Sequence, residues 1–133
     1  MTNRRTFLTA AATVAAAATL PALPAFAMGK SVASGTFEGR SNHVTSGGVN
    51  IIEENGRYFV ELADDFSLDG GPDPRVGFGN DGQYDHDAYL GALLNLTGKQ
   101  RYALPSTWNY KNYNEVYIWC EVASVPLGVA SIK

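Results

Sequence analysis

Cys120 is the only cysteine in this 133-residue chain. A lone thiol cannot form a disulfide within the chain, so three uses of Cys120 remain open: a small buried hydrophobic residue, a reactive thiol, or a ligand. The thiolate is the form that attacks or binds a metal, whereas a thiol buried without a cationic neighbour is unreactive. The chemistry available to this chain therefore depends on the surroundings of Cys120.

The two imidazoles that could act together with Cys120 belong to His43 and His86. His43 is the stronger candidate for binding a cofactor because it begins a predicted strand, and its alternative use is to hold a surface turn together. A copper site of the cupredoxin type needs two His, one Cys and often a Met, yet neither His nor Met follows Cys120. Structural zinc would lack one ligand. Haem or another prosthetic group stays open, since one thiolate or imidazole can be an axial ligand, and the sequence equally allows no cofactor.

Aspartate and glycine are frequent in the segment 64–87. Its carboxylates include Asp65, Asp69 and Asp73, which together with His86 are weak candidates for metal ligands. Ca²⁺ takes about six to eight oxygen ligands from flexible loops, but the spacing here is not that of an EF-hand. Short carboxylates next to Gly and Pro also accept the backbone hydrogen bonds of turns. We therefore expect turn formation as their main use, with a calcium site as the alternative.

The elements that must position these side chains are short apolar runs rich in Val, Ile, Tyr and Phe, separated by Gly, Pro, Asn and Asp. This pattern predicts an all-β protein. The predicted strands span residues 32–37, 43–53, 58–63, 75–78, 92–97, 100–104, 116–122 and 127–132. Asn55-Gly56 predicts a tight hairpin turn, because both residues tolerate positive φ, and Thr97-Gly98 predicts a second one. Segment 64–87 is predicted to be a loop interrupted by one short strand. We expect a single antiparallel β-sandwich of about eight short strands.

Alternation along the predicted strand near Cys120 indicates which way the thiol points. Side chains of a strand face opposite sides in turn. The face predicted to meet the core holds Val116, Ile118, Cys120 and Val122. Tyr117 and Trp119 then lie on the opposite face, where they either pack under the loop 109–114 or form an exposed aromatic patch for a partner.

The N-terminal residues have the pattern of an export signal. Arg4-Arg5 precede an uncharged, Ala-rich stretch over residues 10–20, and Ala25-Phe26-Ala27 has the small residues of a cleavage site. This pattern predicts a twin-arginine signal peptide over residues 1–27 and one domain over residues 28–133, in the periplasm or outside the cell. A membrane anchor is the alternative, but prolines 21 and 24 interrupt the run, and no membrane span is expected after cleavage.

The charge balance limits the classes of partner. The chain has 10 Lys and Arg against 13 Asp and Glu, a formal net charge of -3. An acidic chain does not suit nucleic acid or anionic lipid, which both favour a basic face. Neither a phosphate-binding Gly loop after a strand nor an arguable Ser-His-Asp triad is present, so no conventional enzyme is predicted. The partner classes left are a redox partner or another envelope protein, and the oligomeric state is not indicated.

Several short blocks occur in an order that resembles a known family. They are Gly35-Thr36-Phe37, His43-Val44-Thr45-Ser46-Gly47, Asp65-Phe66 with Gly71-Pro72-Asp73, Gln100-Arg101-Tyr102-Ala103-Leu104-Pro105, and Val116-Tyr117-Ile118-Trp119-Cys120. From about residue 35 to residue 132, this order resembles the electron-transfer domain called DM-thirteen, also found in Skeletor-type extracellular proteins. The block ending in Ile-Trp-Cys is the most specific. Ala123, Pro126 and Leu127 depart from the pattern, where larger side chains are expected.

The resemblance implies a small β-sandwich redox domain. It also implies that the cysteine matching Cys120 acts in redox chemistry, either as a thiol or through a bound prosthetic group. The predicted function is therefore that of an exported electron-transfer accessory domain centred on Cys120. The alternative is a non-catalytic module that binds a partner protein, a polysaccharide or Ca²⁺ through its acidic loops and aromatic face.

Overall fold

The computed structural model describes residues 29–133, and the predicted signal peptide, residues 1–27, lies outside the described residues. Ten strands form in this part of the chain. They are β1 (Lys30–Gly39), β2 (Thr45–Ser46), β3 (Gly48–Glu54), β4 (Arg57–Leu62), β5 (Ser67–Leu68), β6 (Pro74–Asn80), β7 (Gln83–Ala92), β8 (Gln100–Ala103), β9 (Glu115–Cys120) and β10 (Val125–Ser131). The short 3₁₀ turn η2 (Tyr110–Asn112) lies before β9.

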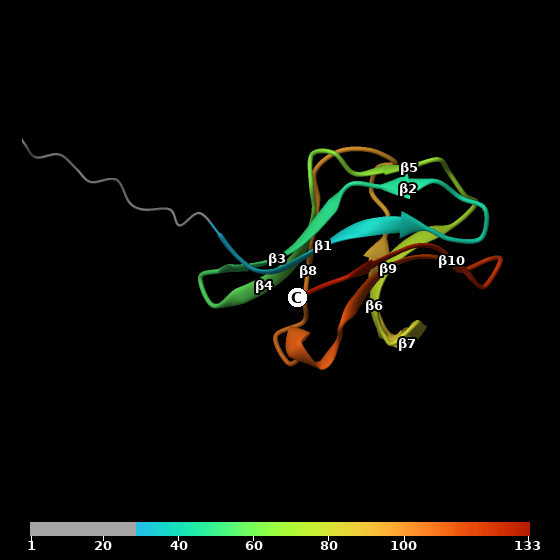
Figure 1. Ribbon diagram of the computed structural model, residues 1–133. Coiled ribbons are helices and arrows are strands. Elements are labelled where there is room, and N and C mark those ends of the chain that lie inside the picture. The colour runs from blue at the N-terminus through green and yellow to red at the C-terminus, as the bar shows by residue number, and fades with distance from the viewer. Residues whose placement is uncertain (1–28) are drawn as a thin grey trace, which may run out of the picture.

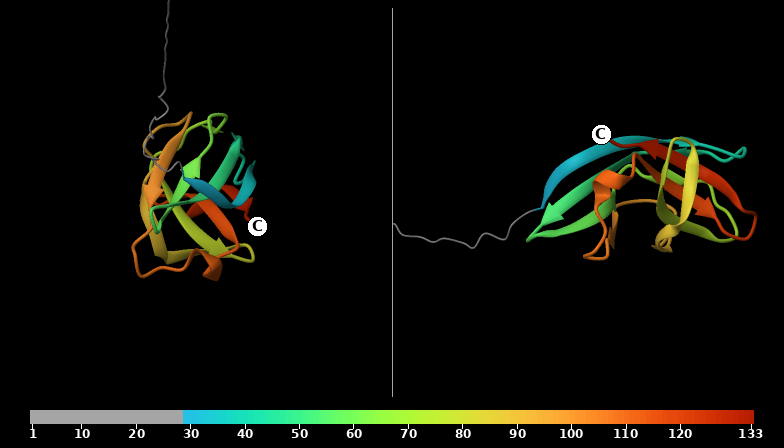
Figure 2. Two further views of the ribbon diagram at one scale, coloured as in Figure 1. Left: turned by 90° about the vertical axis from the view of Figure 1, so that its left-hand side faces the viewer. Right: turned by 90° about the horizontal axis from the view of Figure 1, so that it is seen from below.

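One large antiparallel sheet contains eight of these strands, in the order β7-β6-β9-β10-β1-β3-β4-β8. The sheet curves strongly round one interior and is nearly closed into a barrel (Figures 1 and 2). The small second sheet pairs β2 with β5. The predicted all-β antiparallel fold is thus confirmed, and parts of one curved sheet form the layers that face each other across the core.

The interior is filled by apolar side chains from almost every strand. The largest side chains that are fully buried are Tyr117, Phe66, Phe78, Ile51, Leu62, Ile118, Leu127, Val49, Val60, Val76 and Val116, with Cys120 among them. Burial of such side chains is the main force that closes the sheet. None of the described residues 29–133 belongs to a helix long and apolar enough to cross a membrane.

The turn between β3 and β4 has the predicted form. Asn55 has φ of 54° and Gly56 has φ of 79°, so both central residues are left-handed, as a two-residue hairpin of this kind requires. The strands on either side pair in register from Glu54 and Arg57 onward. The predicted Asn55-Gly56 hairpin is confirmed.

The predicted strand 92–97 is wrong, because only Ala92 belongs to a strand, the end of β7. The following residues form an irregular connection to β8, so Thr97-Gly98 does not join two strands. The side chain of Gln100, 6% exposed, takes the place of a neighbouring strand. Its Oε1 accepts hydrogen bonds from the backbone N–H groups of Leu94 (3.2 Å) and Asn95 (3.0 Å), so this backbone is satisfied without a ladder.

Within segment 64–87, the predicted short strand 75–78 is confirmed, since it lies inside β6, but the loop predicted around it is wrong where β5 and the first half of β7 form. β7 is an edge strand that pairs with β6 alone. Its residues 83–87 are polar, as edge strands often are, which hid the strand from a pattern search for apolar residues. The predicted strand 116–122 ends at Cys120, and Val122 is 72% exposed in the turn that follows rather than in the core.

Candidate functional site

Cys120 is the last residue of β9, between Pro74 of β6 and Val125 of β10. Its thiol is free, 1% exposed and part of the hydrophobic core. The predicted inward orientation is therefore confirmed. A sulfur in this position cannot reach the disulfide or thiol of another protein while the strand stays folded, because exchange requires direct attack on sulfur.

His43 lies in the loop before β2 and is held by Asp69, which follows β5. Its Nδ1 is 2.8 Å from Oδ1 of Asp69. The other carboxylate oxygen accepts a hydrogen bond from the backbone N–H of Val44 at 2.9 Å. The hydrogen bond from Val44, followed by the one from His43, lowers the pKa of Asp69 below its ordinary value of 3.8. The pair thus fastens two loops together, and His43 has a partner other than Cys120.

The remaining sequence candidates have partners of their own. Oδ1 of Asp65 accepts from the backbone N–H of Gly48 at 2.9 Å, and Asp73 forms an ion pair with Arg75 at 3.1 Å. Within residues 29–133, no three side chains of His, Cys, Asp or Glu gather in a way that could hold a metal ion.

A shared prosthetic group does not fit Cys120 and His43 either. A haem needs a cavity beside its axial ligand, and Cys120 is instead enclosed by core side chains. Three surface pockets of the described part are lined by other residues than these two.

A cluster of rings covers the outer face of β9, beside Cys120. It consists of Tyr84, His86, Tyr117 and Trp119, and we call it the outer aromatic cluster. The rings of Tyr84 and Trp119 are stacked, with centroids 4.5 Å apart and planes at 8°. His86 meets both edge-on, at 4.9 Å and 5.3 Å. Tyr84 also contacts the ring of Tyr117 at 5.6 Å, and such contacts add to the energy of burial.

The predicted cover for Tyr117 and Trp119, the loop 109–114, is wrong. β7 covers them instead, and Tyr117 is 1% exposed as a result. The loop packs elsewhere: its Tyr113 stacks on Phe78 at 4.6 Å. β7 and β9 are not paired with each other, because β6 lies between them in the sheet. The contact between their side chains therefore arises only in the tertiary fold.

Two glycines of β6 allow this close crossing. A Cβ atom at Gly79 would meet the carbonyl oxygen of Gln83 and would lie 2.6 Å from Cε1 of Tyr117. At Gly77 it would lie 2.9 Å from Cε1 of Tyr84. The register of β7 on β6 shifts between these glycines, which is the irregularity expected of a bulge. The sequence does contain a signal for this cluster. Gly77 and Gly79 alternate along one strand, and Tyr84 and His86 alternate along the next.

The outer aromatic cluster lines a surface pocket of about 380 Å³, together with Gln83 and Pro126. Nε1 of Trp119 is buried there and has no hydrogen-bond partner among the residues described. Burial, followed by the charge of Glu121, raises the pKa of Tyr84 to about 12. The phenol of Tyr84 therefore stays neutral over the ordinary pH range.

Comparison with known proteins gives one match. The family model described as Electron transfer DM13 matches residues 36–132. No curated protein and no solved structure matches the chain.

Proposed function

This chain belongs to the electron-transfer DM13 family, and we propose that it is an exported electron-transfer accessory domain whose redox centre is Cys120. The proposal that it is exported rests on the twin-arginine pattern of residues 1–27. An oxidised external carrier would take one electron from the Cys120 thiol, whose proton passes to solvent, leaving a thiyl radical. A reduced carrier would then return one electron, and solvent would return the proton. We expect these carriers to be proteins of the same compartment.

The observation that carries this proposal is the peptide bond between Cys120, whose thiol lies in the core, and Trp119 at the surface pocket. Its neighbour Trp119 places an indole on the outer side of β9, where the ring stacks on Tyr84 at 4.5 Å. Electrons can pass between side chains in such contact without the thiol meeting a partner. Burial also protects the sulfur from the stepwise oxidation that exposed thiolates undergo.

The alternative is a non-catalytic module that binds a partner, and one observation favours it. Cys120 is enclosed in the core, which is the usual place of a cysteine that serves as a small hydrophobic residue. The calcium variant of this alternative has less support, because Asp65, Asp69 and Asp73 each serve a backbone group or a neighbouring side chain.

Voltammetry of the exported protein separates the two functions, and titration of its thiol tests the burial of Cys120. We expect one thiol to react only after unfolding, because the sulfur is 1% exposed. We expect a one-electron signal that Cys120→Ser abolishes while the circular dichroism of the β-sheet is kept. A full signal in Cys120→Ser would exclude Cys120 as the redox centre.

The two tryptophans of the chain offer a matched pair of variants for the path. Trp119→Phe keeps a ring on β9 but removes the indole, so we expect slower electron transfer with the same fold. Trp108→Phe, which changes a ring that packs near Tyr113, is the control and should exchange electrons as the wild type does. Equal rates in all three proteins would show that the path avoids the outer aromatic cluster.

A further inference from the structure

We propose that the pocket of the outer aromatic cluster is the docking site of a positively charged one-electron carrier protein. This inference rests on the electron-transfer function proposed above and adds the surface and the kind of partner. It follows from three features of the same face: an aromatic pocket, the carboxylates of Glu115 and Glu121 beside it, and the peptide bond that joins Trp119 of the pocket to Cys120.

The pocket is open to a partner and has an apolar floor. Tyr84 is half-buried and His86 is exposed, so both are accessible from outside while Tyr117 lies beneath them. Pro126 of β10 forms the other wall. A partner that covers this pocket would bury aromatic rings, which commonly supply the binding energy at the centre of an interface.

Two carboxylates lie beside the pocket, those of Glu115 and Glu121. Glu115 accepts hydrogen bonds from the N–H of Gly82 (2.8 Å) and the hydroxyl of Tyr117 (3.1 Å), both residues of the pocket lining. The charge of Glu121 raises the pKa of Tyr84 and the charge of Arg75 lowers it, so both groups lie near that ring.

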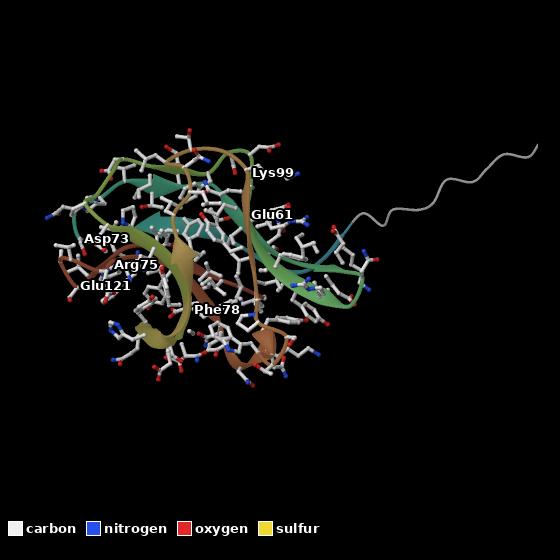
Figure 3. All side chains as sticks on the ribbon, turned by 180° about the vertical axis from the view of Figure 1, so that it is seen from behind. Glu61, Asp73, Arg75, Phe78, Lys99 and Glu121 are labelled. Atoms are coloured by element: carbon white, nitrogen blue, oxygen red, sulfur yellow. The ribbon has the colours of Figure 1, made fainter. Side chains whose placement is uncertain are left out.

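The cations near this face are already neutralised. Arg75 is paired with Asp73 at 3.1 Å, and Arg40 with Glu38 at 3.4 Å. Asp73, Arg75 and Glu121 lie together at one end of the molecule, away from Glu61 and Lys99 (Figure 3). The carboxylates round the pocket therefore give this face a net negative charge.

Charge complementarity selects a basic protein as the occupant. Opposite charges steer two proteins together and set the rate of encounter more than the final affinity. Carriers that exchange electrons use small, transient interfaces of this kind. A pocket of aromatic rings within an acidic border suits lysine side chains of the partner, which can contact both the carboxylates and the faces of the rings.

The test titrates the ¹⁵N-labelled exported protein with a basic c-type cytochrome and, separately, with an acidic flavodoxin. We expect the cytochrome to shift amide signals of residues 82–87 and 117–126, and high salt to remove the shifts. The variant Glu121→Lys should weaken binding by about threefold or more at low salt. The control, Glu53→Lys, reverses the same charge away from the pocket and should bind nearly as the wild type does.

Three results would overturn the docking site: shifts that map to another face, binding of the flavodoxin that equals that of the cytochrome, or equal weakening by Glu121→Lys and Glu53→Lys. These shifts are measured without electron transfer. A missing voltammetric signal therefore contradicts the proposed function, whereas shifts in the wrong place contradict the docking site.

Discussion

Cys120 and His43, the two side chains with the most versatile chemistry, are engaged by different neighbours. The thiol packs in the core at the end of β9, and the imidazole lies against the carboxylate of Asp69 at 2.8 Å. A joint site for these two residues therefore has no support in the fold. At the scale of single residues, the sulfur packs among core side chains, and the imidazole joins two loops through Asp69.

The His43–Asp69 contact should make stability depend on pH. Because the pKa of Asp69 is lowered in the folded state, mainly by the N–H of Val44, the stabilisation is present above the ordinary pKa of 3.8 and is lost as the pH falls through the lowered folded value. Asp69→Asn should lower the melting temperature near neutral pH, and the difference from wild type should shrink below pH 3.8. Thermal melts at a series of pH values measure it. Asp64→Asn, in a nearby turn, is the control, and a pH-independent difference for Asp69→Asn would contradict the prediction.

At the scale of elements, the face that holds the outer aromatic cluster depends on how β7 lies on β6. The edge strand shifts register at Gly77 and Gly79, and the absence of Cβ atoms there lets Tyr84 lie against Tyr117 and Trp119. The cluster is therefore a product of two neighbouring strands and the space between them. Neither strand could form it alone.

Gly79→Ala should disturb this crossing. The new Cβ would overlap the carbonyl of Gln83 and the ring of Tyr117, so we expect a loss of about 1–3 kcal/mol in the free energy of unfolding. Gly48→Ala is the matched control, because its Cβ would lie 3.5 Å from Cβ of Ala63, an ordinary contact, and should cause little change or a gain of up to about 1 kcal/mol. Urea unfolding measures both, and near-ultraviolet circular dichroism reports on the Tyr84–Trp119 stack. Equal effects of the two substitutions would show that a Cβ atom at position 79 fits between β7 and the ring of Tyr117.

At the scale of the whole molecule, the curved sheet brings its two edge strands towards each other without pairing them. β7 and β8 are joined by residues 93–99, and Gln100 holds this connection from inside. Its Nε2 donates to the carbonyls of Asn95 (2.9 Å) and Gly98 (3.1 Å). The hydroxyl of Tyr102 also donates to Oε1 of Gln100 at 2.6 Å, which completes a small buried network.

Gln100→Leu should loosen the connection. It leaves the N–H of Asn95 without its acceptor and removes both bonds from Nε2, so we expect a loss of roughly 2–4 kcal/mol. Hydrogen exchange should become faster at the amides of Leu94 and Asn95, while the hairpin at Asn55 is unchanged. Gln83→Leu, which changes the exposed glutamine of β7, is the control. Unchanged exchange at Leu94 and Asn95 would contradict the role given to Gln100.

The sequence by itself determined the all-β class, the Asn55-Gly56 hairpin and the inward orientation of Cys120. Each depends on local properties: alternation along a strand, or the backbone freedom of two adjacent residues. The order of several short sequence blocks also indicated the family. The most specific of them, which ends in Ile-Trp-Cys, forms part of β9.

Only the tertiary structure decided what covers Trp119, what His43 contacts and how the sheet nearly closes. β7 is polar because it is an edge strand, so its sequence resembled a loop, and its position over β9 depends on pairing with β6. The connection 93–99 is stabilised by a side chain, Gln100, that no periodic pattern includes. Contacts between residues far apart in the chain arise from the packing of the whole sheet. Local sequence patterns depend only on neighbouring residues, so they do not predict these contacts.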